Sequence, residues 1–538
     1  MRELRPPRYL APFDSDSVPH RFTSVLVIGS GAAGLRAAIE ASRYAPVVVV
    51  TKDELKASNT DWAQGGIAAA VGPDDSVEQH LADTLEVGGG LGVPEAARFI
   101  VGQAAERIHE LADWGAEFDR DGDRLALTRE GGHSRERVVH ARGDATGAEV
   151  EKTLIERLGR CPNLRTLEHT YVIDLLGLDN ECLGAVTWSQ ARGLTLVWAE
   201  AVVLATGGAG QVFRETTNPR IATGDGLAMA YRAGCELRDL EFVQFHPTTL
   251  YVAGAARVLI SEAARGEGGV LVNKYGERFM EKYSPMKELA PRDVVSRAIL
   301  AEMQQTGDTN VYLDLTHVDA ARLAARFPQI KEFCSLFDIN IHEDRIPVCP
   351  SAHYMIGGVR TDLNGATSVD RLFACGEVGW TGLHGANRLG SNSLLEALAM
   401  GKSAGAAAGK LAAGGGTRST ERPPRIEAEP RKPGVGAIDL DDVRSSVRSN
   451  MWRNVGMVRH EQGLGRALER LAFWSGYVLE RGFNTPRGWR IQNMLILARQ
   501  IAKAALAREE SRGVHYRADF PDSDPEPRHS IIRPPAER

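Results

Sequence analysis

Residues 23–35 constrain the fold more than any other part of the chain. They read as a short buried strand over residues 25–28, then a glycine turn and the start of a helix. Gly29, Gly31 and Gly34 form G-x-G-x-x-G between strand and helix, the context in which this motif predicts a dinucleotide site. The glycines allow a tight turn, close approach of a pyrophosphate and helix–strand packing, and the helix N-terminus attracts phosphate. A plain glycine turn inside the core is the less favoured alternative.

The end of the next predicted strand bears on which dinucleotide binds. Residues 47–50 are a second apolar run, and an acid at its end would bind a ribose hydroxyl in a simple NAD site. The run ends instead in Thr51 and Lys52, and Asp53 comes only afterwards. This departure argues against a simple NAD site and leaves FAD open, because other segments can hold its adenosine half.

Length and charge limit the class of protein. At 538 residues the chain is too long for one ordinary core, so we expect two or three domains. The net charge of −6 and the lack of a long basic run argue against nucleic acid or a membrane surface as partner. No window approaches the roughly 20 apolar residues of a membrane span, and residues 1–20 lack the apolar core of a signal peptide. The six scattered cysteines indicate reduced thiols in a cytoplasmic protein, with no metal or iron–sulfur site.

The pattern of strands and helices predicts an α/β fold with added helices. A second strand-then-glycine run at 201–210 and a third at 372–377 indicate that one nucleotide-binding domain is interrupted by an insertion. The C-terminal region shows amphipathic helical patterns without strand signals, which favours a helical bundle. The expected organisation is a flexible arm (1–20), a Rossmann-like nucleotide-binding domain (21–250 and 351–410), an inserted α+β domain (251–350), a linker (411–437), a C-terminal helical domain (438–520) and a disordered or surface-bound tail (521–538).

Several stretches place hydrogen-bonding or cationic side chains beside glycines. Two arginines with two histidines and a hydroxyl would suit a small dicarboxylate, because a guanidinium binds a carboxylate by a planar two-bond fork. Taken singly, each histidine is more often structural and each arginine more often a surface charge. Stretch 127–134, with Glu130 and His133 around two glycines, reads from spacing alone as a charged surface turn. The candidate stretches are 244–248, 261–269, 291–297, 353–358 and 384–394.

These motifs, in this order, make the chain similar to the succinate dehydrogenase and fumarate reductase flavoprotein family, over about residues 22–520. The Thr51–Lys52 end of the second strand also suits this family, in which Ser or Thr followed by Lys is common there. The resemblance implies an FAD-binding domain and an inserted capping domain that closes over the substrate. The motifs that carry it are the glycine fingerprint at 29–34, Ala-Gln-Gly-Gly at 63–66, and the stretches 244–248, 265–269, 291–297, 384–395 and 510–517.

Two features distinguish between members of the family. Members that assemble with iron–sulfur partners carry a histidine shortly before Ala-Gln-Gly-Gly that bonds covalently to the flavin; here residues 58–62 contain none, which implies non-covalent FAD. Residues 129–134 resemble the signature of members that oxidise L-aspartate, in which the glutamate, here Glu130, faces the substrate amine. An ammonium needs an acceptor that succinate does not, and a buried carboxylate without that partner is left unpaired.

The resemblance therefore implies FAD-dependent oxidation of L-aspartate to iminoaspartate, with O2 (giving H2O2) or fumarate as electron acceptor. This is the first step of de novo NAD biosynthesis, which feeds quinolinate synthase. One alternative is a soluble fumarate reductase or succinate-oxidising flavoprotein. Another is a flavin-binding scaffold without turnover, against which the predicted dicarboxylate clamp argues.

The resemblance also assigns roles to individual residues. Arg292 matches the family's catalytic arginine, and Glu262 and Arg265 match its proton relay. Whether Arg292 transfers a proton or acts as a fixed charge stays open, because the pKa of arginine is above about 12. Substrate binding is expected from Glu130 at the amine and from His246, Thr248, Ser261, His353 and Arg388 at the carboxylates. Cofactor binding is expected from Gly29, Ser30, Gly31, Ala32, Ala33, Gly34, Lys52, Asn59, Thr60, Asp61, Trp62, Ala63, Gln64, Gly65, Gly66, Asp225, Glu377, Ser393 and Leu394.

Overall fold

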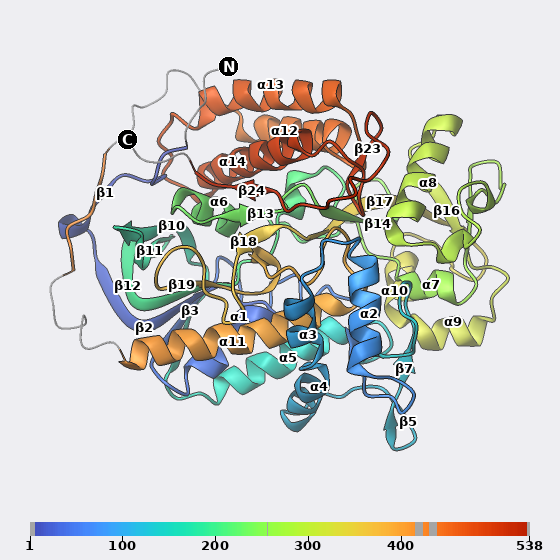
Figure 1. Ribbon diagram of the computed structural model, residues 1–538, viewed down its shortest axis with the longest axis horizontal. Helices are drawn as coiled ribbons and strands as arrows, with labels where there is room; N and C mark the ends of the chain where they lie inside the picture. The colour runs from blue at the N-terminus through green and yellow to red at the C-terminus, as the bar shows by residue number, and fades with distance from the viewer. Residues whose placement is uncertain (1–5, 256, 415–422, 430–437, 535–538) are drawn as a thin grey trace.

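A seven-stranded sheet forms the centre of the computed structural model, which describes residues 6–255, 257–414, 423–429 and 438–534 (Figure 1). The strand order is β10-β11-β12-β2-β3-β9, and β19 pairs with the end of β12. Strands β12, β2, β3, β9 and β19 are parallel, whereas β10 and β11 extend the sheet antiparallel. The strands are β2 (His20–Ile28), β3 (Val47–Val50), β9 (Leu164–Leu167), β10 (Tyr171–Leu178), β11 (Glu181–Ser189), β12 (Gly193–Leu204) and β19 (Leu372–Ala374).

Helices α1 (Ala32–Ala41), α5 (Thr146–Gly159) and α11 (Asn392–Gly414) cover one face of this sheet (Figure 1). Gly401, Gly405 and Gly409 recur every four residues on α11, so they share one side of the helix. A Cβ atom at Gly405 would lie 2.3 Å from the carbonyl oxygen of Ala37 on α1. The glycine spacing therefore lets α11 approach the backbone of α1 directly, which fixes the helix that carries the fingerprint.

The other face packs against α6 (Asp225–Arg232) and the C-terminal helices α12 (Leu440–Asn454), α13 (Glu461–Val478) and α14 (Pro486–Ala507). α14 is buried along most of its length because it lies between α6 and the other two C-terminal helices. Its hydrophobic residues join those of β12 and α6 in one continuous core. The predicted helical C-terminal region is therefore packed onto the nucleotide-binding fold (Figure 1).

A separate antiparallel sheet, β14-β17-β16-β15, carries the inserted region at the right of Figure 1. Strands β14 (Val243–Leu250) and β17 (Ile346–Met355) pair with each other, and the chain between them builds the rest of the insertion with its own core. The inserted elements are α7 (Glu262–Gly266), β15 (Val270–Val272), α8 (Arg292–Thr306), β16 (Val311–Asp314), α9 (Ala320–Arg326) and α10 (Pro328–Ser335).

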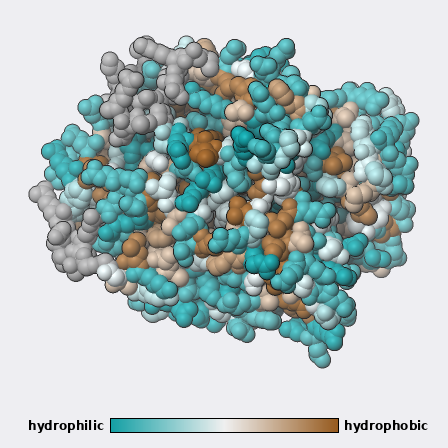
Figure 2. Space-filling model, viewed as in Figure 1, coloured by the Kyte–Doolittle hydropathy of each residue, from teal (hydrophilic) through white to brown (hydrophobic). Residues whose placement is uncertain are grey.

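The remaining α-helices and strands surround these units. They are β1 (Phe13–Asp14), β4 (Ile67–Ala68), α2 (Val77–Val87), α3 (Pro94–Val101), α4 (Ala104–Asp113), β5 (Arg120–Asp121), β6 (Arg124–Leu125), β7 (Leu127–Thr128), β8 (Val138–Val139), β13 (Leu237–Arg238), β18 (Gly358–Arg360), β20 (Gly379–Trp380), β21 (Glu427–Ala428), β22 (Val458–Arg459), β23 (Tyr516–Arg517) and β24 (Ile531–Ile532). The face in Figure 2 is mostly hydrophilic, with apolar side chains in separate patches. No helix in the described ranges is long and apolar enough to cross a membrane.

The predicted fold class, α/β with added helices, is confirmed. The expectation of a flexible arm is wrong for its described part: Leu10 and Phe13 are buried, and β1 pairs with β21. Burial of these two apolar side chains holds the segment in place, although its composition is rich in Arg and Pro. Within the expected linker, residues 415–422 and 430–437 lie outside the described residues. The described tail is surface-bound, because β24 pairs with β13. The domain boundaries themselves stay a prediction.

Candidate active site

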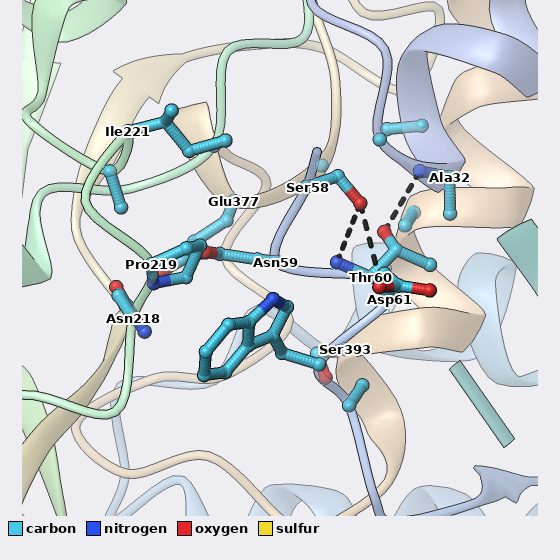
Figure 3. A pocket seen from close by; sticks show the side chains of 18 of the residues that line it. Ala32, Ser58, Asn59, Thr60, Asp61, Asn218, Pro219, Ile221, Glu377 and Ser393 are labelled. Carbon is cyan, nitrogen blue, oxygen red and sulfur yellow. Dashed lines mark hydrogen bonds between the residues drawn. The ribbon is translucent and has the colours of Figure 1, made fainter. Parts of the chain in front are cut away.

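A cavity of about 600 Å³ opens at the carboxyl ends of the parallel strands. Gly29, Thr51, Ala205 and Cys375 each follow directly after one of these strands, and all four line the cavity. This edge is where open parallel sheets bind their ligands. The loop around residues 58–66 forms one wall, and residues 217–222 form another (Figure 3). Residues of the inserted region line the far end, so the cavity lies between that region and the central sheet.

The fingerprint glycines have different tasks. Gly29 has a φ of +112°, and a Cβ atom there would lie 2.2 Å from the carbonyl oxygen of Ala205. Gly34 does not line the cavity; a Cβ atom there would lie 2.1 Å from the carbonyl oxygen of Gly29, so its task is helix–strand packing. Gly31 is the N-cap of α1, and the hydroxyl of Thr60 accepts a 3.0 Å hydrogen bond from the Ala32 N–H (Figure 3).

Lys52 and Asp225 meet at one end of the cavity. The Lys52 ammonium donates to Asp225 Oδ2 at 2.5 Å, and the Thr223 hydroxyl donates to the same oxygen. Tyr171 and Asn493 both donate to Oδ1 at 2.9 Å. Burial raises the pKa of Asp225, but the positive charge of Lys52 and these donors outweigh burial and lower it to about 2. The carboxylate therefore stays ionised and already has four donors, close to its acceptor capacity.

The middle of the cavity is lined by buried polar atoms that lack partners. Asn59 donates to Glu377 Oε2 at 3.2 Å, and the second oxygen of Glu377 accepts from the Met355 N–H at 2.9 Å. Burial raises the pKa of Glu377. Among the described residues, no partner reaches Asn59 Oδ1, Gln64 Oε1 or Thr206 Oγ1. Because buried polar groups are normally hydrogen-bonded, these atoms indicate a ligand rich in hydrogen-bonding groups.

Two arginines lie at the opposite end, joined by one glutamine. Gln244 Oε1 accepts from Arg292 at 3.3 Å and from Arg388 Nε at 3.2 Å. Arg388 also donates to the Ser393 hydroxyl at 2.6 Å and stacks over the ring of Tyr354 at 4.5 Å. Burial and the nearby Arg292 lower the pKa of Arg388 to about 10, so it remains charged at neutral pH. Both arginines line the cavity, and their hydrogen bonds to Gln244 fix the orientation of each guanidinium group.

A carboxylate faces the same end from the turn between β7 and β8. Glu130 is 7% exposed, and its Oε2 atom accepts a 2.9 Å hydrogen bond from the Ser391 hydroxyl. Arg292 lies 3.9 Å from the same oxygen. Within the described chain no donor reaches the other oxygen, Oε1, which lies beside Gly65 of the cavity wall. Glu130 is therefore a buried acceptor with one oxygen available. The interpretation of stretch 127–134 as a charged surface turn is wrong for this carboxylate.

Two histidines complete this end. The rings of His246 and His353 lie 5.5 Å apart, and Thr217 Oγ1 lies 2.9 Å from His353 Nδ1. Burial and the nearby arginines lower the pKa of both histidines well below 6.5, so both are neutral at neutral pH. Among the described residues His246 Nε2 has no hydrogen-bond partner. A neutral imidazole with a free ring nitrogen can bind a carboxylate oxygen as a hydrogen-bond donor.

Behind Arg292, a chain of charges leads into the inserted region. Arg292 Nε donates to Glu262 Oε2 at 2.6 Å, and Arg265 lies 3.4 Å from Glu262 Oε1. Burial raises the pKa of Glu262, but Arg292 and Arg265 outweigh it and lower the value below 4.5. Burial lowers the pKa of Arg292, but Glu262 and Glu130 outweigh it and raise the value. Arg265 does not line the cavity; it is buried and donates to the Glu288 carbonyl.

The structure brings most of the predicted site residues to this one cavity. Thr248 does not line it, because its hydroxyl donates to the Ile260 carbonyl. The predicted direct substrate contact of Thr248 is therefore corrected to a supporting place behind the cavity wall. Arg265, predicted as part of the proton relay, also lies behind the wall. The predicted residues that line the cavity are Gly29, Ser30, Gly31, Ala32, Ala33, Lys52, Asn59, Thr60, Asp61, Trp62, Ala63, Gln64, Gly65, Gly66, Glu130, Asp225, His246, Ser261, Glu262, Arg292, His353, Glu377, Arg388, Ser393 and Leu394.

Several residues at the site were missing from the sequence-based assignment. Gln244 lies two positions before His246 on β14 and opens the stretch 244–248, which was already singled out. Ser391 lies three positions after Arg388, within a stretch already singled out. Tyr354 holds Arg388 and lies within the stretch 353–358, which was also singled out. Thr217 holds His353, and no sequence signal pointed to it.

Two family models match the chain. The FAD binding domain matches residues 24–394, and the fumarate reductase flavoprotein C-terminal domain matches residues 444–532. The fold and the cavity, with its glycine turn, charged ends and unpartnered polar atoms, suit such a cofactor. They define a flavoprotein that binds FAD.

Relatives and solved structures define the family further. An L-aspartate oxidase of Streptomyces coelicolor is 44% identical and covers 95% of this chain and 91% of its own. One of Pseudomonas aeruginosa is 43% identical and covers 96% and 99%. An E. coli quinol fumarate reductase variant has a TM-score of 0.87 at 33% identity, covering 95% of this chain and 94% of its own. The chain belongs to the L-aspartate oxidases, within the succinate dehydrogenase and fumarate reductase flavoprotein family.

Proposed function

We propose that the chain oxidises L-aspartate to iminoaspartate with non-covalently bound FAD. The observation that carries this proposal is Glu130, a buried carboxylate with an available oxygen at the end of the cavity where two arginines and two histidines converge. A substrate that is only a dicarboxylate gives this oxygen nothing to bind, whereas an ammonium group satisfies it. The names of the relatives support the same substrate.

The charge balance of the site supports an amino dicarboxylate. Three guanidinium groups and two carboxylates lie together, and with both histidines neutral they leave one net positive charge; they are Arg265, Arg292, Arg388, Glu130 and Glu262. L-Aspartate carries one net negative charge at neutral pH and succinate carries two. Buried charge is costly unless it is paired, so the net charge of these five side chains suits the single negative charge of aspartate better than the double charge of succinate.

Each residue has a task in this proposal. Arg388, His353 and His246 bind the substrate carboxylates, and Ser261 lines the cavity beside them. Glu130 orients the ammonium and accepts the proton that nitrogen loses as the C=N bond forms. Arg292 stays protonated because Glu262 and Glu130 raise its pKa, so it acts as a fixed positive charge in amine oxidation.

FAD, when bound, supplies the acceptor for the hydride, two electrons and one proton, that leaves the substrate Cα in this oxidation. The glycine turn and Lys52 would hold its phosphate and adenosine end, residues 59–66 would line the flavin, and Asp225 and Glu377 would lie near its hydroxyl groups. No histidine is present in residues 58–62, which supports non-covalent binding. Because Asp225 already has four donors, it serves mainly to anchor Lys52, Tyr171 and Asn493.

The electrons would leave to O2, giving H2O2, or to fumarate. Iminoaspartate would then feed quinolinate synthase as the first step of de novo NAD biosynthesis. The six cysteines are all free thiols, which supports a reducing, cytoplasmic setting.

A second function is reduction of fumarate or oxidation of succinate. The observation that favours it is the row of charged side chains behind the cavity. Arg292, Glu262 and Arg265 form a continuous path from the cavity wall into the inserted region. Proton delivery to a substrate carbon needs such a path, whereas amine oxidation does not.

The experiment is H2O2 release by the FAD-loaded protein in air, with L-aspartate or succinate. Aspartate-dependent H2O2 that is lost in Glu130→Gln supports the proposal. Glu136→Gln is the matched control, since Glu136 is exposed in the same segment. Succinate or fumarate turnover with an artificial electron carrier, together with no response to aspartate, would replace the proposal with the second function.

A further inference from the structure

His133 lies just behind the substrate end of the cavity and has no place in the proposed chemistry. It is 6% exposed, and it does not line the cavity. It belongs to the turn between β7 and β8 that carries Glu130, and its backbone N–H donates to the Glu130 carbonyl at 3.2 Å. A buried imidazole needs partners for its ring nitrogens, so the question is what they bind.

The surroundings determine which ring nitrogen of His133 carries the proton. Arg137 Nη1 lies 3.5 Å from Nδ1, and because a guanidinium can only donate, Nδ1 has to be the acceptor. Arg137 is fully buried and is held by Asp75 and Asp83. Burial lowers the pKa of His133, so the ring is neutral. The single ring proton is therefore on Nε2, which donates to the Gly390 carbonyl at 3.0 Å.

The segment held by this bond is the one that contacts Glu130. Ser391 has a φ of +60°, a left-handed conformation that costs a non-glycine residue free energy unless its surroundings hold it. Its hydroxyl donates to Glu130 Oε2 and accepts from the Gly66 N–H at 3.3 Å. A Cβ atom at Gly390 would lie 2.5 Å from Glu130 Oε2. Residues 390 and 391 thus fix the carboxylate by packing and by a hydrogen bond.

We propose that His133 is a positioning residue: it holds the Gly390–Ser391 turn against Glu130 and so sets the preference for an amino dicarboxylate over a plain dicarboxylate. This inference rests on the proposed role of Glu130. The same residue connects both sides of the contact: its backbone N–H donates to the Glu130 carbonyl, and its ring donates to the Gly390 carbonyl.

The carboxylate-binding groups are held by other partners. Arg388 is fixed by Gln244, Ser393 and Tyr354, and His353 by Thr217. Loss of the His133 ring should therefore weaken binding of the amine and leave binding of the carboxylates largely unchanged. A merely structural role would weaken binding of aspartate and succinate together.

The test compares His133→Ala, His133→Gln and Ser391→Ala in the FAD-loaded enzyme. The readouts are the dissociation constants of aspartate and succinate from changes in the flavin absorbance under anaerobic conditions, with KM and kcat for aspartate. In His133→Ala we expect aspartate binding to weaken roughly tenfold, the size of one lost hydrogen bond to a charged group, and succinate binding to change by less than about twofold. Gln offers an amide N–H to the Gly390 carbonyl, so His133→Gln should recover most of the loss. His109→Ala, at an exposed histidine, is the control.

A double-mutant cycle tests whether His133 acts through Ser391. If it does, His133→Ala/Ser391→Ala loses no more aspartate affinity than the worse single variant. Additive losses, equal weakening of aspartate and succinate, or no recovery in His133→Gln would overturn the inference. If His133→Ala does not fold, the Gln and Ser391 variants decide it alone. If the enzyme binds aspartate but does not oxidise it, the proposed function is refuted. The ratio of the dissociation constants of aspartate and succinate still tests the role of His133.

Discussion

Arg292 Nε donates a 2.6 Å hydrogen bond to Glu262 Oε2, and both side chains are almost fully buried. On the other side of that carboxylate, a Cβ atom at Gly131 would lie 2.3 Å from Glu262 Oε1. The glycine-rich turn that carries Glu130 thus packs directly on the partner of Arg292. The position of the amine acceptor and the position of the fixed positive charge are therefore coupled through Glu262.

The first prediction concerns Glu262→Gln. The amide keeps the shape but removes the negative charge, which leaves Arg292 and Arg265 without their shared counter-charge. We expect kcat for aspartate to fall roughly tenfold or more, and the free energy of unfolding to fall by about 3 kcal/mol at pH 7, because a buried ion has lost its partner. Steady-state kinetics and urea unfolding measure the two effects, with Glu343→Gln at an exposed position as control.

The pH dependence of that stability difference is a second check on the same variant. The pKa of Glu262 is lower in the folded protein than its ordinary value of 4.5, so its ionised form stabilises the fold above that value. The contribution is lost as pH falls through the folded pKa. The wild-type advantage over Glu262→Gln should thus be largest near neutrality and shrink below about pH 4.5. A constant difference from pH 7 to pH 4 would contradict the ion-pair explanation.

The second prediction concerns Arg388→Lys. Lysine keeps the charge but lacks the planar fork that binds Gln244, Ser393 and the Tyr354 ring at once. We expect KM for aspartate to rise roughly tenfold or more, with a similar loss of succinate affinity, because the group binds a carboxylate common to both. The bound FAD content should stay unchanged. Equal KM values in the two enzymes would remove Arg388 from the substrate site.

The sequence allowed prediction of the nucleotide-binding fold because its signals are local. The fingerprint glycines, the apolar strands and the helical periodicity each act over fewer than about a dozen residues. The clustering of His246, Arg292, His353 and Arg388 could be predicted only through resemblance, since they come from β14, α8, β17 and a loop. The spacing of residues along the sequence does not reveal that such distant segments meet in the fold.

The errors in the site have a similar physical origin. Thr248 follows His246 by two positions, so strand alternation places both on one face. The pairing of β14 with β17 shifts register between His246 and Thr249, and such an irregularity redirects side chains. The Thr248 hydroxyl therefore points to the Ile260 carbonyl. A shift of this kind depends on the partner strand and has no signature in the segment itself.

The third prediction concerns the pair formed by Lys52 and Asp225. Lys52→Met removes the charge that contributes most to lowering the pKa of Asp225 to about 2, and it leaves the buried carboxylate without its ion-pair partner. We expect FAD affinity to fall roughly tenfold, and Lys52→Met/Asp225→Asn to bind FAD better than Lys52→Met alone. Fluorescence titration of the apoenzyme with FAD measures this. Additive losses in the double variant would show that the two residues bind the cofactor independently.

The fourth prediction concerns Asp144, which joins the inserted region to the loop before α5. Its two oxygens accept from the Gln329 and Ile330 N–H groups at the start of α10, at 3.2 Å each, and Gln329 lines the cavity. Burial raises the pKa of Asp144 from 3.8 to about 6, although the two N–H groups oppose the shift. Between pH 3.8 and about pH 6, the Asp144 carboxyl is ionised in the unfolded chain and protonated in the folded chain. This contribution to stability is therefore full below the unfolded pKa and is lost as pH rises through the folded pKa.

Asp144→Asn cannot ionise and offers one acceptor oxygen instead of two. At pH 4 we expect it to be less stable than the wild type, because one helix N–H loses its acceptor. From pH 4 to pH 7 the wild type should lose about 2 to 3 kcal/mol relative to the variant, so the difference narrows and then reverses. Urea unfolding of the FAD-loaded enzymes at pH 4, 5.5 and 7 measures this. A difference independent of pH would show that folding does not change the pKa of Asp144, and that it acts on α10 as an ordinary helix cap.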